Sequence, residues 1–476
     1  MALGNRGRGR WEQIQDSLRN NEQGHVLQFF EQLGEEERLE LLQQVEKVDY
    51  VALRREVLRL WRPSGAGFIF KPASCTQLAS TPAEKEHWRR AEELGRTAIA
   101  SGHVAVITVA GGQATRLGFD HSKGMFPITP VKGKSLFQLF AEKIHAWERR
   151  CGRDIFWLIL SSPTNHRETC DFFSKNGNFG LRQVHIFPQG VLPSLDRDGR
   201  LILEKKNAVA MHPDGHGGLL EALGRSGLLP MLRENGVEHL SYFQVDNPLA
   251  MPIDPAFIGF HIQQQSQFSS RCVVKKYAAE KVGVFVESDG RLRVVEYMDL
   301  SAECSCAQDA SGRLRFGWAN VAIHLFSLDF LEPFCHDCGW QVLPFHLSQK
   351  KIPYLNGAGH LVRPVEANGF KLERFIFDLL PRAERALLLE GRREEMFSPV
   401  KNAAGLDSVE TSQRDQVRQF AEWLSKGRVD LSRDDSGLPP FFLEISPLFA
   451  DTMEEFLQKW AEMPIKPAVG ANFYLE

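Results

Sequence analysis

Residues 109–126 read VAGGQATRLGFDHSKGMF, and this stretch decides how the chain folds. The apolar run HVAVITVA leads directly into Gly111 and Gly112, which predicts a buried strand followed by a glycine-rich turn. Paired glycines after a strand let backbone N–H groups approach an anion without interference from a Cβ atom. Arg116 can form bidentate hydrogen bonds to phosphate oxygens, and Lys123 adds a positive charge. The stretch therefore predicts a triphosphate-binding site.

Two better-known glycine motifs do not fit this loop. A Walker loop requires Lys and then Ser or Thr after its last glycine, but Gly118 is followed by Phe119 and Asp120. The dinucleotide fingerprint G-x-G-x-x-G fails at its second glycine. The remaining alternative is a plain strand-to-helix turn with solvated basic residues. The full run of glycines and basic residues favours the triphosphate-binding site over that alternative.

Apolar runs typical of buried strands alternate with amphipathic helical segments on both sides of this loop. Further strands are predicted at 155–160 (IFWLIL), 184–187 and 240–245 (LSYFQV), with helices at 135–149 and 218–225. This alternation predicts an α/β fold with a mixed, mainly parallel sheet and helices on both faces. Ligands of such sheets bind beyond the carboxyl ends of the strands, so functional residues are expected directly after strands.

The pattern of apolar and polar residues divides the chain into three parts. Residues 1–95 are expected to be mainly helical, because apolar residues recur there near helical spacing among Glu and Gln. Residues 96–385 contain the α/β pattern and are predicted to form the catalytic domain. Residues 386–476 are predicted to form a smaller C-terminal domain with a loop at 426–440 and a helix at 451–461.

Composition narrows the class of protein. The 476 residues are 43% hydrophobic and 25% charged with a formal net charge of -3, so no bulk positive field attracts nucleic acid or acidic lipid. No apolar stretch approaches the roughly 18 residues that span a bilayer. The basic start MALGNRGRGR is not followed by an apolar run, so it does not resemble a secretory signal. We therefore expect a soluble cytoplasmic protein that binds neither nucleic acid nor membranes.

The eight cysteines are sparse for this length, which suits free thiols in a reducing compartment. Cys304 and Cys306 form a C-x-C pair, and Cys335 and Cys338 form a C-x-x-C pair. Two such pairs can hold zinc, but only the second has the usual ligand spacing. Free thiols are the favoured interpretation.

The glycine loop and a series of later motifs resemble one enzyme family. GGQATRLG followed by KGMF closely resembles the G-G-x-G-T-R-L-G…K-G-M signature of eukaryotic-type UDP-N-acetylhexosamine pyrophosphorylases. Further family motifs follow in the family's order over nearly the whole chain: FPQGVLP (187–193), LILEKKN (201–207), PDGHGGL (213–219), VDN (245–247), VEY (295–297), NGFKLERFIFD (368–378), EMFSPVKN (395–402) and LEISPL (443–448). The resemblance implies a Rossmann-like nucleotidyltransferase core with small flanking domains.

The activity implied by the resemblance is the formation of UDP-N-acetylglucosamine and pyrophosphate from UTP and N-acetylglucosamine 1-phosphate. A phosphate oxygen of the sugar phosphate would attack the α-phosphorus of UTP in line. That oxygen is already anionic at neutral pH and needs no general base. The reaction instead needs alignment of two anions and neutralisation of their charge, which are tasks for basic residues and a hard ion such as Mg²⁺ or Mn²⁺.

By the same resemblance, individual residues match the family's site positions. The residues expected to act on phosphates are Arg116, Lys123, Lys371 and Lys401. Those expected to bind the nucleotide are Gly111, Gly112, Gln189 and Gly215. Those expected in the sugar pocket are His216, Glu296, Tyr297 and Asn320. Asp246 is the expected metal ligand, because a carboxylate at the carboxyl end of a strand suits Mg²⁺ that bridges phosphates; an Asx turn before Pro248 is the alternative.

Two positions depart from the family pattern. Ala114 stands where glycine is usual, which would strain the loop by about 1–2 kcal/mol if the backbone there had a positive φ. His216 stands where the hexosamine enzymes usually have asparagine, and the G-H-G context is closer to UDP-glucose relatives. UDP-glucose pyrophosphorylase is therefore an alternative within the same chemistry, and a catalytically silent UDP-sugar sensor is an alternative of another class. The oligomeric state is left open, a homo-oligomer included.

Overall fold

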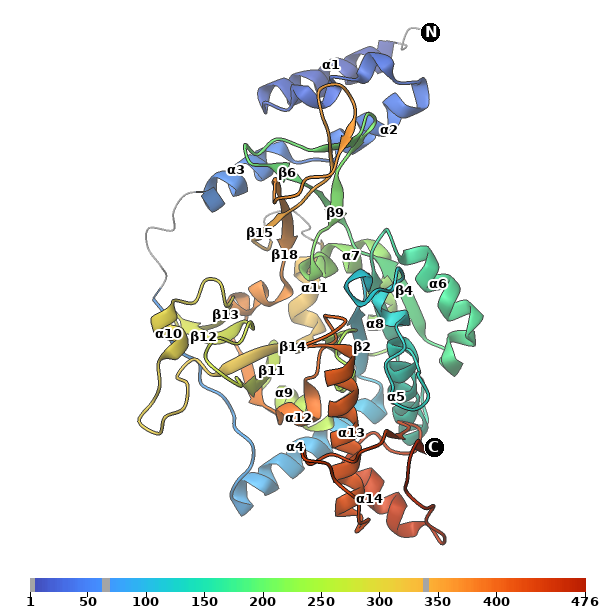
Figure 1. The fold of residues 1–476 in the computed structure, drawn as a ribbon. Coiled ribbons are helices and arrows are strands. Elements are labelled where there is room, and N and C mark those ends of the chain that lie inside the picture. The colour runs from blue at the N-terminus through green and yellow to red at the C-terminus, as the bar shows by residue number, and fades with distance from the viewer. Residues whose placement is uncertain (1–4, 62–68, 337–341) are drawn as a thin grey trace. The chain divides into compact units, whose positions relative to one another are not determined.

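The computed structural model describes residues 5–61, 69–336 and 342–476. The chain forms two compact units, each assembled from segments that are far apart in the sequence (Figure 1). The first unit comprises residues 1–68, 189–221 and 334–378, and the second comprises residues 69–188, 222–333 and 379–476. The predicted division into domains 1–95, 96–385 and 386–476 stays a prediction. Within the described ranges, no helix is long and apolar enough to cross a membrane.

A large mixed sheet forms the centre of the second unit, and its main path runs in the order β1-β12-β14-β10-β2-β3-β4. Its strands are β1 (Lys71–Pro72), β2 (Val104–Val109), β3 (Trp157–Ser161), β4 (Val184–Pro188), β10 (His239–Gln244), β11 (Phe268–Val274), β12 (Val284–Ser288), β13 (Arg291–Val295), β14 (Trp318–Ser327) and β19 (Ala386–Glu390). Strands β10, β2, β3 and β4 are parallel neighbours, and β14 joins β10 in antiparallel orientation. The predicted α/β fold with a mixed sheet is confirmed.

The parallel strands formed where the sequence showed continuous apolar runs. Strand β2 is buried at every residue except the last, which requires protein on both faces of the sheet. By contrast, β11 pairs with β14 antiparallel and with β19 parallel, and β13 pairs with β12. These strands follow no single periodicity in the sequence, and the sequence analysis did not identify them.

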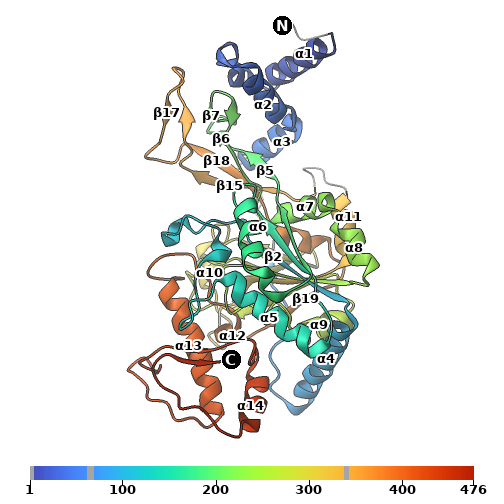
Figure 2. The same ribbon diagram turned by 90° about the vertical axis from the view of Figure 1, so that its right-hand side faces the viewer.

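Helices of the second unit bury the faces of this sheet (Figure 2). Core side chains come from α4 (Pro82–Ser101), α5 (Leu136–Cys151), α6 (His166–Lys175), α9 (Pro255–Gln263) and α12 (Arg393–Met396). The unit also contains α8 (Leu228–Glu234), α10 (Ala302–Cys306), α13 (Val409–Lys426) and α14 (Met453–Glu462). Helices α4 and α9 cross closely, because Gly95 and Gly259 bring no side chain to the crossing. A Cβ atom on Gly259 would lie 1.6 Å from the carbonyl oxygen of Ala91. This crossing therefore requires glycine.

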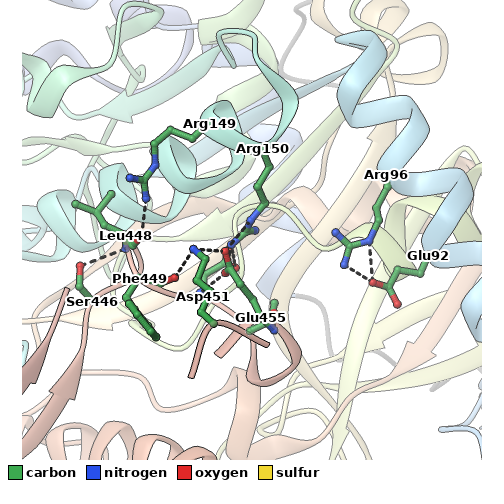
Figure 3. A network of polar contacts seen from close by, with 11 residues as sticks. Glu92, Arg96, Arg149, Arg150, Ser446, Leu448, Phe449, Asp451 and Glu455 are labelled. Carbon is green, nitrogen blue, oxygen red and sulfur yellow. Dashed lines mark hydrogen bonds and ion pairs between the residues drawn. The ribbon is translucent and has the colours of Figure 1, made fainter. Parts of the chain in front are cut away.

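The C-terminal segment is attached to the end of α5 by charged contacts (Figure 3). Arg149 donates to the carbonyl oxygen of Leu448. Arg150 pairs with Asp451 at 2.6 Å and also with Glu455. Past this attachment, β20 (Leu443–Ile445) pairs in parallel with β21 (Phe473–Leu475), and both pack with α13 and α14 around their own apolar cluster. Burial of that cluster stabilises the C-terminal segment itself, and the Arg149 and Arg150 contacts join it to α5.

The first unit contains N-terminal helices and short strands around a separate apolar core. Its helices are α1 (Asn5–Asn20), α2 (Glu35–Glu46) and α3 (Tyr50–Trp61), in agreement with the predicted helical start. Its strands are β5 (Val191–Pro193), β6 (Leu195–Asp196), β7 (Leu203–Lys205), β8 (Ala208–Val209), β9 (Met211–Pro213), β15 (Phe345–Lys350), β16 (Tyr354–Leu355), β17 (Leu361–Val362) and β18 (Gly369–Arg374). β18 lies between β15 and β6. The core includes Val26, Leu41, Leu192 and Leu372, so chain segments distant in sequence share it.

Candidate active site

The glycine loop leaves the carboxyl end of β2 and folds back on itself. The backbone N–H of Lys123 donates to the carbonyl oxygen of Gly112 at 3.0 Å, and Gln113 forms a bridge with Ser122. A Cβ atom on Gly112 would have no neighbour within 4 Å, so the loop presents open backbone at this point. Arg116 is exposed within the short 3-10 turn that follows. The same loop thus presents both open backbone, at Gly112, and an exposed cation, Arg116.

Asp246 lies beside this loop because β10 and β2 are parallel neighbours. Gln244 is in register with Val109, and the backbone N–H of Val245 donates to the carbonyl oxygen of Val109 at 3.1 Å. Asp246 and Gly111 therefore leave adjacent strands at nearly the same level. This is the edge at which ligands of parallel sheets bind.

Lys123 and Asp246 form an ion pair across this edge. The Lys123 Nζ atom lies 3.2 Å from Asp246 Oδ2, and both side chains are 17% exposed. Their partial burial keeps them within reach of a ligand while limiting the screening of their charges by water. The structure therefore brings Gly111, Gly112, Lys123 and Asp246 together, as expected from the sequence.

Two residues that the sequence analysis missed hold the loop in place. Asn165 donates from Nδ2 to the carbonyl oxygen of Ala110 at 3.0 Å and accepts from the Ser162 backbone N–H at 2.7 Å. Glu168 accepts from the backbone N–H of Ser122 at 2.7 Å. Both follow β3, so the position of a polar residue after the strand IFWLIL was the signal that could have identified Asn165.

Lys401 also belongs to the second unit. Its predecessor, Val400, donates a backbone hydrogen bond to the carbonyl oxygen of Asp246 at 2.8 Å. The Lys401 ammonium is about 42% exposed and pairs with Asp407 at 3.3 Å. The segment that carries Lys401 is thus joined by a backbone hydrogen bond to Asp246, while the Lys401 ammonium pairs with the Asp407 carboxylate.

Two of the expected sugar-pocket residues of the second unit, Glu296 and Asn320, contact Gly283. The backbone N–H of Asn320 donates to the carbonyl oxygen of Gly283 at 2.8 Å. A Cβ atom on Gly283 would lie 2.9 Å from Glu296 Oε1, so the Glu296 carboxylate packs against this glycine. Tyr297 follows with a side chain that is 39% exposed. Glu296, which directly follows β13, and Asn320, on β14, therefore both lie next to Gly283.

The first unit carries Gln189, Gly215, His216 and Lys371. Gln189 is buried, and the next residue accepts a backbone hydrogen bond from Asp214 at 3.2 Å. Gly215 has φ +82°, and a Cβ atom there would lie 2.5 Å from the carbonyl oxygen of Arg374. Both facts require glycine at this position.

His216 is fixed as a neutral imidazole. Its Nδ1 atom accepts from the backbone N–H of Ile376 at 3.1 Å, which leaves the proton on Nε2. The ring stacks on Phe375 at 5.1 Å with 9° between the planes. Burial, reinforced by the positive field of nearby His346, lowers the pKa of His216 to about 3. His216 therefore offers one N–H donor and no charge near neutral pH.

Lys371 lies on β18, opposite Ser348 of β15. Burial lowers the pKa of Lys371, and the nearby Glu373 carboxylate partly offsets this effect. Lys371 in turn adds to the burial that lowers the pKa of His212 to about 4. A partly desolvated ammonium of this kind is strongly stabilised by an anionic ligand.

Ala114 carries no strain. Its φ is -95° and its ψ is 25°, outside the left-handed region that favours glycine. The departure from the family's glycine at this position is therefore compatible with the loop. The left-handed residue of the loop is instead Gly118, with φ +71°.

Comparison with known proteins assigns the chain to a family. A family model described as UTP–glucose-1-phosphate uridylyltransferase matches residues 73–420. The chain belongs to this UDPGP family. The UDP-N-acetylglucosamine diphosphorylase 2 of Arabidopsis thaliana is 35% identical, over 86% of this chain and 84% of the plant protein. The human UDP-N-acetylhexosamine pyrophosphorylase-like protein 1 is 34% identical, over 94% of this chain and 95% of the human protein.

A solved structure has the same fold. It is the uridine diphosphate N-acetylglucosamine pyrophosphorylase of Trypanosoma brucei in complex with an inhibitor, with a TM-score of 0.81, 28% identity and 98% of each chain covered. The predicted enzyme class is confirmed: the chain is a nucleotidyltransferase of the UDP-sugar pyrophosphorylase family.

For a UDPGP-family enzyme, Asp246 is the residue that fits a divalent ion. The described residues contain no group of three or more His, Cys, Asp or Glu side chains that could enclose a metal. Mg²⁺ does not need such a cage, because it commonly binds one or two carboxylates together with substrate phosphates and water. Asp246 is half-buried at the strand edge beside the glycine loop and meets this requirement. Bound there, the ion would neutralise charge on the phosphates.

Three of the four cysteines singled out in the sequence lie within the described residues. Cys304 and Cys306 are in α10 of the second unit, and Cys335 is buried in a segment of the first unit. Cys338 lies outside the described residues.

Proposed function

We propose that this UDPGP-family enzyme forms UDP-N-acetylglucosamine and pyrophosphate from UTP and N-acetylglucosamine 1-phosphate. The observation that supports this most directly is the common edge of β2 and β10, where open glycine backbone, the Lys123 ammonium and the Asp246 carboxylate meet. The names of the plant and trypanosome relatives favour the N-acetylglucosamine substrate.

In the proposed reaction, an oxygen of the sugar 1-phosphate attacks the α-phosphorus of UTP. A new P–O bond forms, the bond between the α-phosphorus and the bridging oxygen breaks, and pyrophosphate leaves with that electron pair. Lys123 and Arg116 hold phosphate oxygens and stabilise the charge that spreads over them in the transition state. To do so, the Lys123 ammonium must be shared between Asp246 and the incoming phosphates. Asp246 holds the divalent ion.

The remaining predicted roles are part of the same proposal. Gln189 and Gly215 read the uracil edge, Glu296, Tyr297, Asn320 and His216 contact the sugar, and Lys371 and Lys401 contact phosphate. Burial lowers the pKa of the Lys371 ammonium, and an anion beside it offsets this cost of burying the charge. That property favours a phosphate contact over a purely solvated surface lysine.

The test measures pyrophosphate release from UTP with Mg²⁺ and, in separate reactions, N-acetylglucosamine 1-phosphate or glucose 1-phosphate. We expect a higher kcat/KM with N-acetylglucosamine 1-phosphate. Equal or higher kcat/KM with glucose 1-phosphate would support the UDP-glucose alternative, which His216 favours because that position is usually asparagine in the hexosamine enzymes.

A silent UDP-sugar sensor is the second candidate of another class. It is favoured only by the resemblance to a human protein named as pyrophosphorylase-like. Measurable UTP binding without pyrophosphate release from either sugar phosphate would establish it. The ion pair of Lys123 and Asp246 argues against it, because binding alone does not need paired groups for charge neutralisation.

A further inference from the structure

The side-chain amide of Asn247 joins two distant backbone segments. Asn247 is 3% exposed, and its Nδ2 donates to the carbonyl oxygen of Met396 at 2.7 Å. Its Oδ1 accepts from the backbone N–H of Ser398 at 3.0 Å. Because the amide supplies a donor and an acceptor at once, it pairs with the second segment as a neighbouring strand would.

A third hydrogen bond completes this arrangement. The carbonyl oxygen of Asp246 accepts from the backbone N–H of Val400 at 2.8 Å. We call these three bonds, which join Asp246 and Asn247 to residues 396–400, the Asn247 clamp. Lys401 is the next residue after the clamp, so the proposed metal ligand and a proposed phosphate contact are held in register although 155 positions separate them.

Only part of this region is closely packed: Val245, Met396 and Val400 belong to the apolar core of the second unit, whereas a cavity borders Pro248 and Leu249. A cavity of about 250 Å³ is lined by Pro248 and Leu249 on one side of the clamp and by Glu395 on the other. The segment after Asn247 is held by the ammonium of Lys143 instead, which donates to the carbonyl oxygens of Pro248 at 2.7 Å and Ala250 at 2.8 Å. Directional hydrogen bonds therefore act together with the packing of the buried Val245 and Val400 side chains to set the position of Asp246.

The other half of the clamp is anchored to α13. Ser398 donates from Oγ to Asp415 at 2.7 Å, and its carbonyl oxygen accepts from the Ser412 hydroxyl at 3.1 Å. Ser412 is fully buried in the first turns of that helix. The segment that receives the Asn247 amide is thus itself fixed, and it can serve as a reference for Asp246.

We propose that Asn247 is a positioning residue for uridylyl transfer: its clamp fixes the Asp246 carboxylate relative to Lys401. The inference rests on the proposed function. Groups that align two anions act only within a narrow range of positions, and a displacement of about 1 Å can cost roughly 100-fold in rate. Asn247 does not need to touch the substrate to have this effect.

The first test compares Asn247→Asp and Asn247→Ala with the wild-type enzyme. The aspartate keeps an acceptor for Ser398 but loses the donor to Met396, and the alanine loses both. We expect kcat to fall about 10- to 100-fold in each, with little change in the KM for UTP. Ile144→Ala, which removes buried side-chain volume from α5 without touching the clamp, is the control and should lower Tm but leave kcat unchanged.

The second test separates positioning from general loss of structure. In an Asp246→Ala background, Asn247→Ala should lower kcat no further, because the group that it positions is already absent. An additive loss in the double variant would overturn the proposal. So would wild-type kcat in both Asn247 variants.

A binding measurement tests whether Asn247 positions Asp246 without relying on catalysis. Calorimetry with UTP is run once in EDTA and once with Mg²⁺. The gain in affinity from Mg²⁺ should be lost in Asn247→Ala, while the affinity in EDTA stays within about twofold of wild type. If wild type releases no pyrophosphate, the proposed reaction fails, yet this loss would still support positioning of Asp246. An unchanged gain in affinity would reject the positioning role whatever the activity.

Discussion

The ammonium of Lys123 lies 3.2 Å from a carboxylate oxygen of Asp246, and the two residues leave the sheet from neighbouring parallel strands. The two residues are 123 positions apart in the sequence, so their proximity in the chain does not explain the ion pair. The pairing arises because β10 inserts beside β2. The ion pair therefore depends on the fold. The effect of each residue on turnover can be measured separately from its effect on stability.

Removing either member of this pair should abolish most turnover and leave the fold intact. We expect Lys123→Ala and Asp246→Ala each to lower kcat by about 100-fold or more, because each removes charge stabilisation at the phosphates. The free energy of unfolding should change by only about 1 kcal/mol, since both side chains retain solvent contact. Steady-state kinetics and urea denaturation measure the two effects. Asp154→Ala, which breaks a surface pair with Arg182, is the matched control; unfolding of Asp246→Ala would show a structural role instead.

Substitution of His216 should change the preference between sugar phosphates. The neutral ring presents a single Nε2 donor, because Nδ1 is occupied by the Ile376 backbone N–H. His216→Asn supplies both a donor and an acceptor, as in the hexosamine enzymes that the sequence resembles. We expect the ratio of kcat/KM for N-acetylglucosamine 1-phosphate over glucose 1-phosphate to rise about 10-fold. An unchanged ratio would exclude His216 from sugar selection, and His185→Asn in the second unit serves as the control.

Protonation of His239 should destabilise the protein in mild acid. Burial lowers its pKa from 6.5 to about 4, although the neighbouring Glu238 carboxylate opposes this. Between these values the unfolded chain binds the proton and the folded chain does not, so stability is complete above pH 6.5 and decreases as the pH falls. We expect this residue to remove about 2 kcal/mol between pH 7 and pH 5.

Denaturation of wild type and His239→Gln at both pH values isolates the contribution of His239. The variant should show the smaller loss between pH 7 and pH 5. His87→Gln, an exposed histidine of the same unit, should behave as wild type. Equal losses in wild type and His239→Gln would contradict the assignment.

Glu444 should be a major support of the turn that precedes α5. Its buried carboxylate accepts from the backbone N–H groups of Val131 at 2.9 Å and Lys132 at 2.8 Å. Glu444→Leu leaves both donors without a partner and should cost about 2–4 kcal/mol of stability. Hydrogen exchange at residues 131 and 132 should accelerate in the variant. Glu454→Leu, at an exposed position of the same C-terminal segment, should change stability by about 0.5 kcal/mol or less.

The elements with a single strong periodicity could be predicted from the sequence. The apolar runs before Gly111 and before Asp246 became β2 and β10, close to the expected residues. Their parallel pairing followed from the α/β pattern, and this alone placed Gly111 and Asp246 at one edge. The antiparallel half of the sheet could not be predicted, because strands such as β14 are interrupted: Ala322 within it has φ +55°.

Most of the residues that hold the candidate site in place could likewise not be predicted from the sequence. Glu168 and Asn247 act through backbone groups of residues that are distant in the chain, and such contacts have no local pattern; only Asn165 had a signal, its position after a predicted strand. The roles of the other predicted residues came from a resemblance in motif order. Those roles stay predictions until the variants above are measured.

The interleaved division of the chain has a consequence for its synthesis. The first unit cannot be completed until residues 334–378 have left the ribosome, and by then most of the second unit has already been made. The N-terminal helices have core partners in residues 189–221, but their core stays incomplete until Phe345 and Leu372, encoded some 300 positions later, have been made. Nascent chains halted before residue 334 should be the ones that chaperones retain.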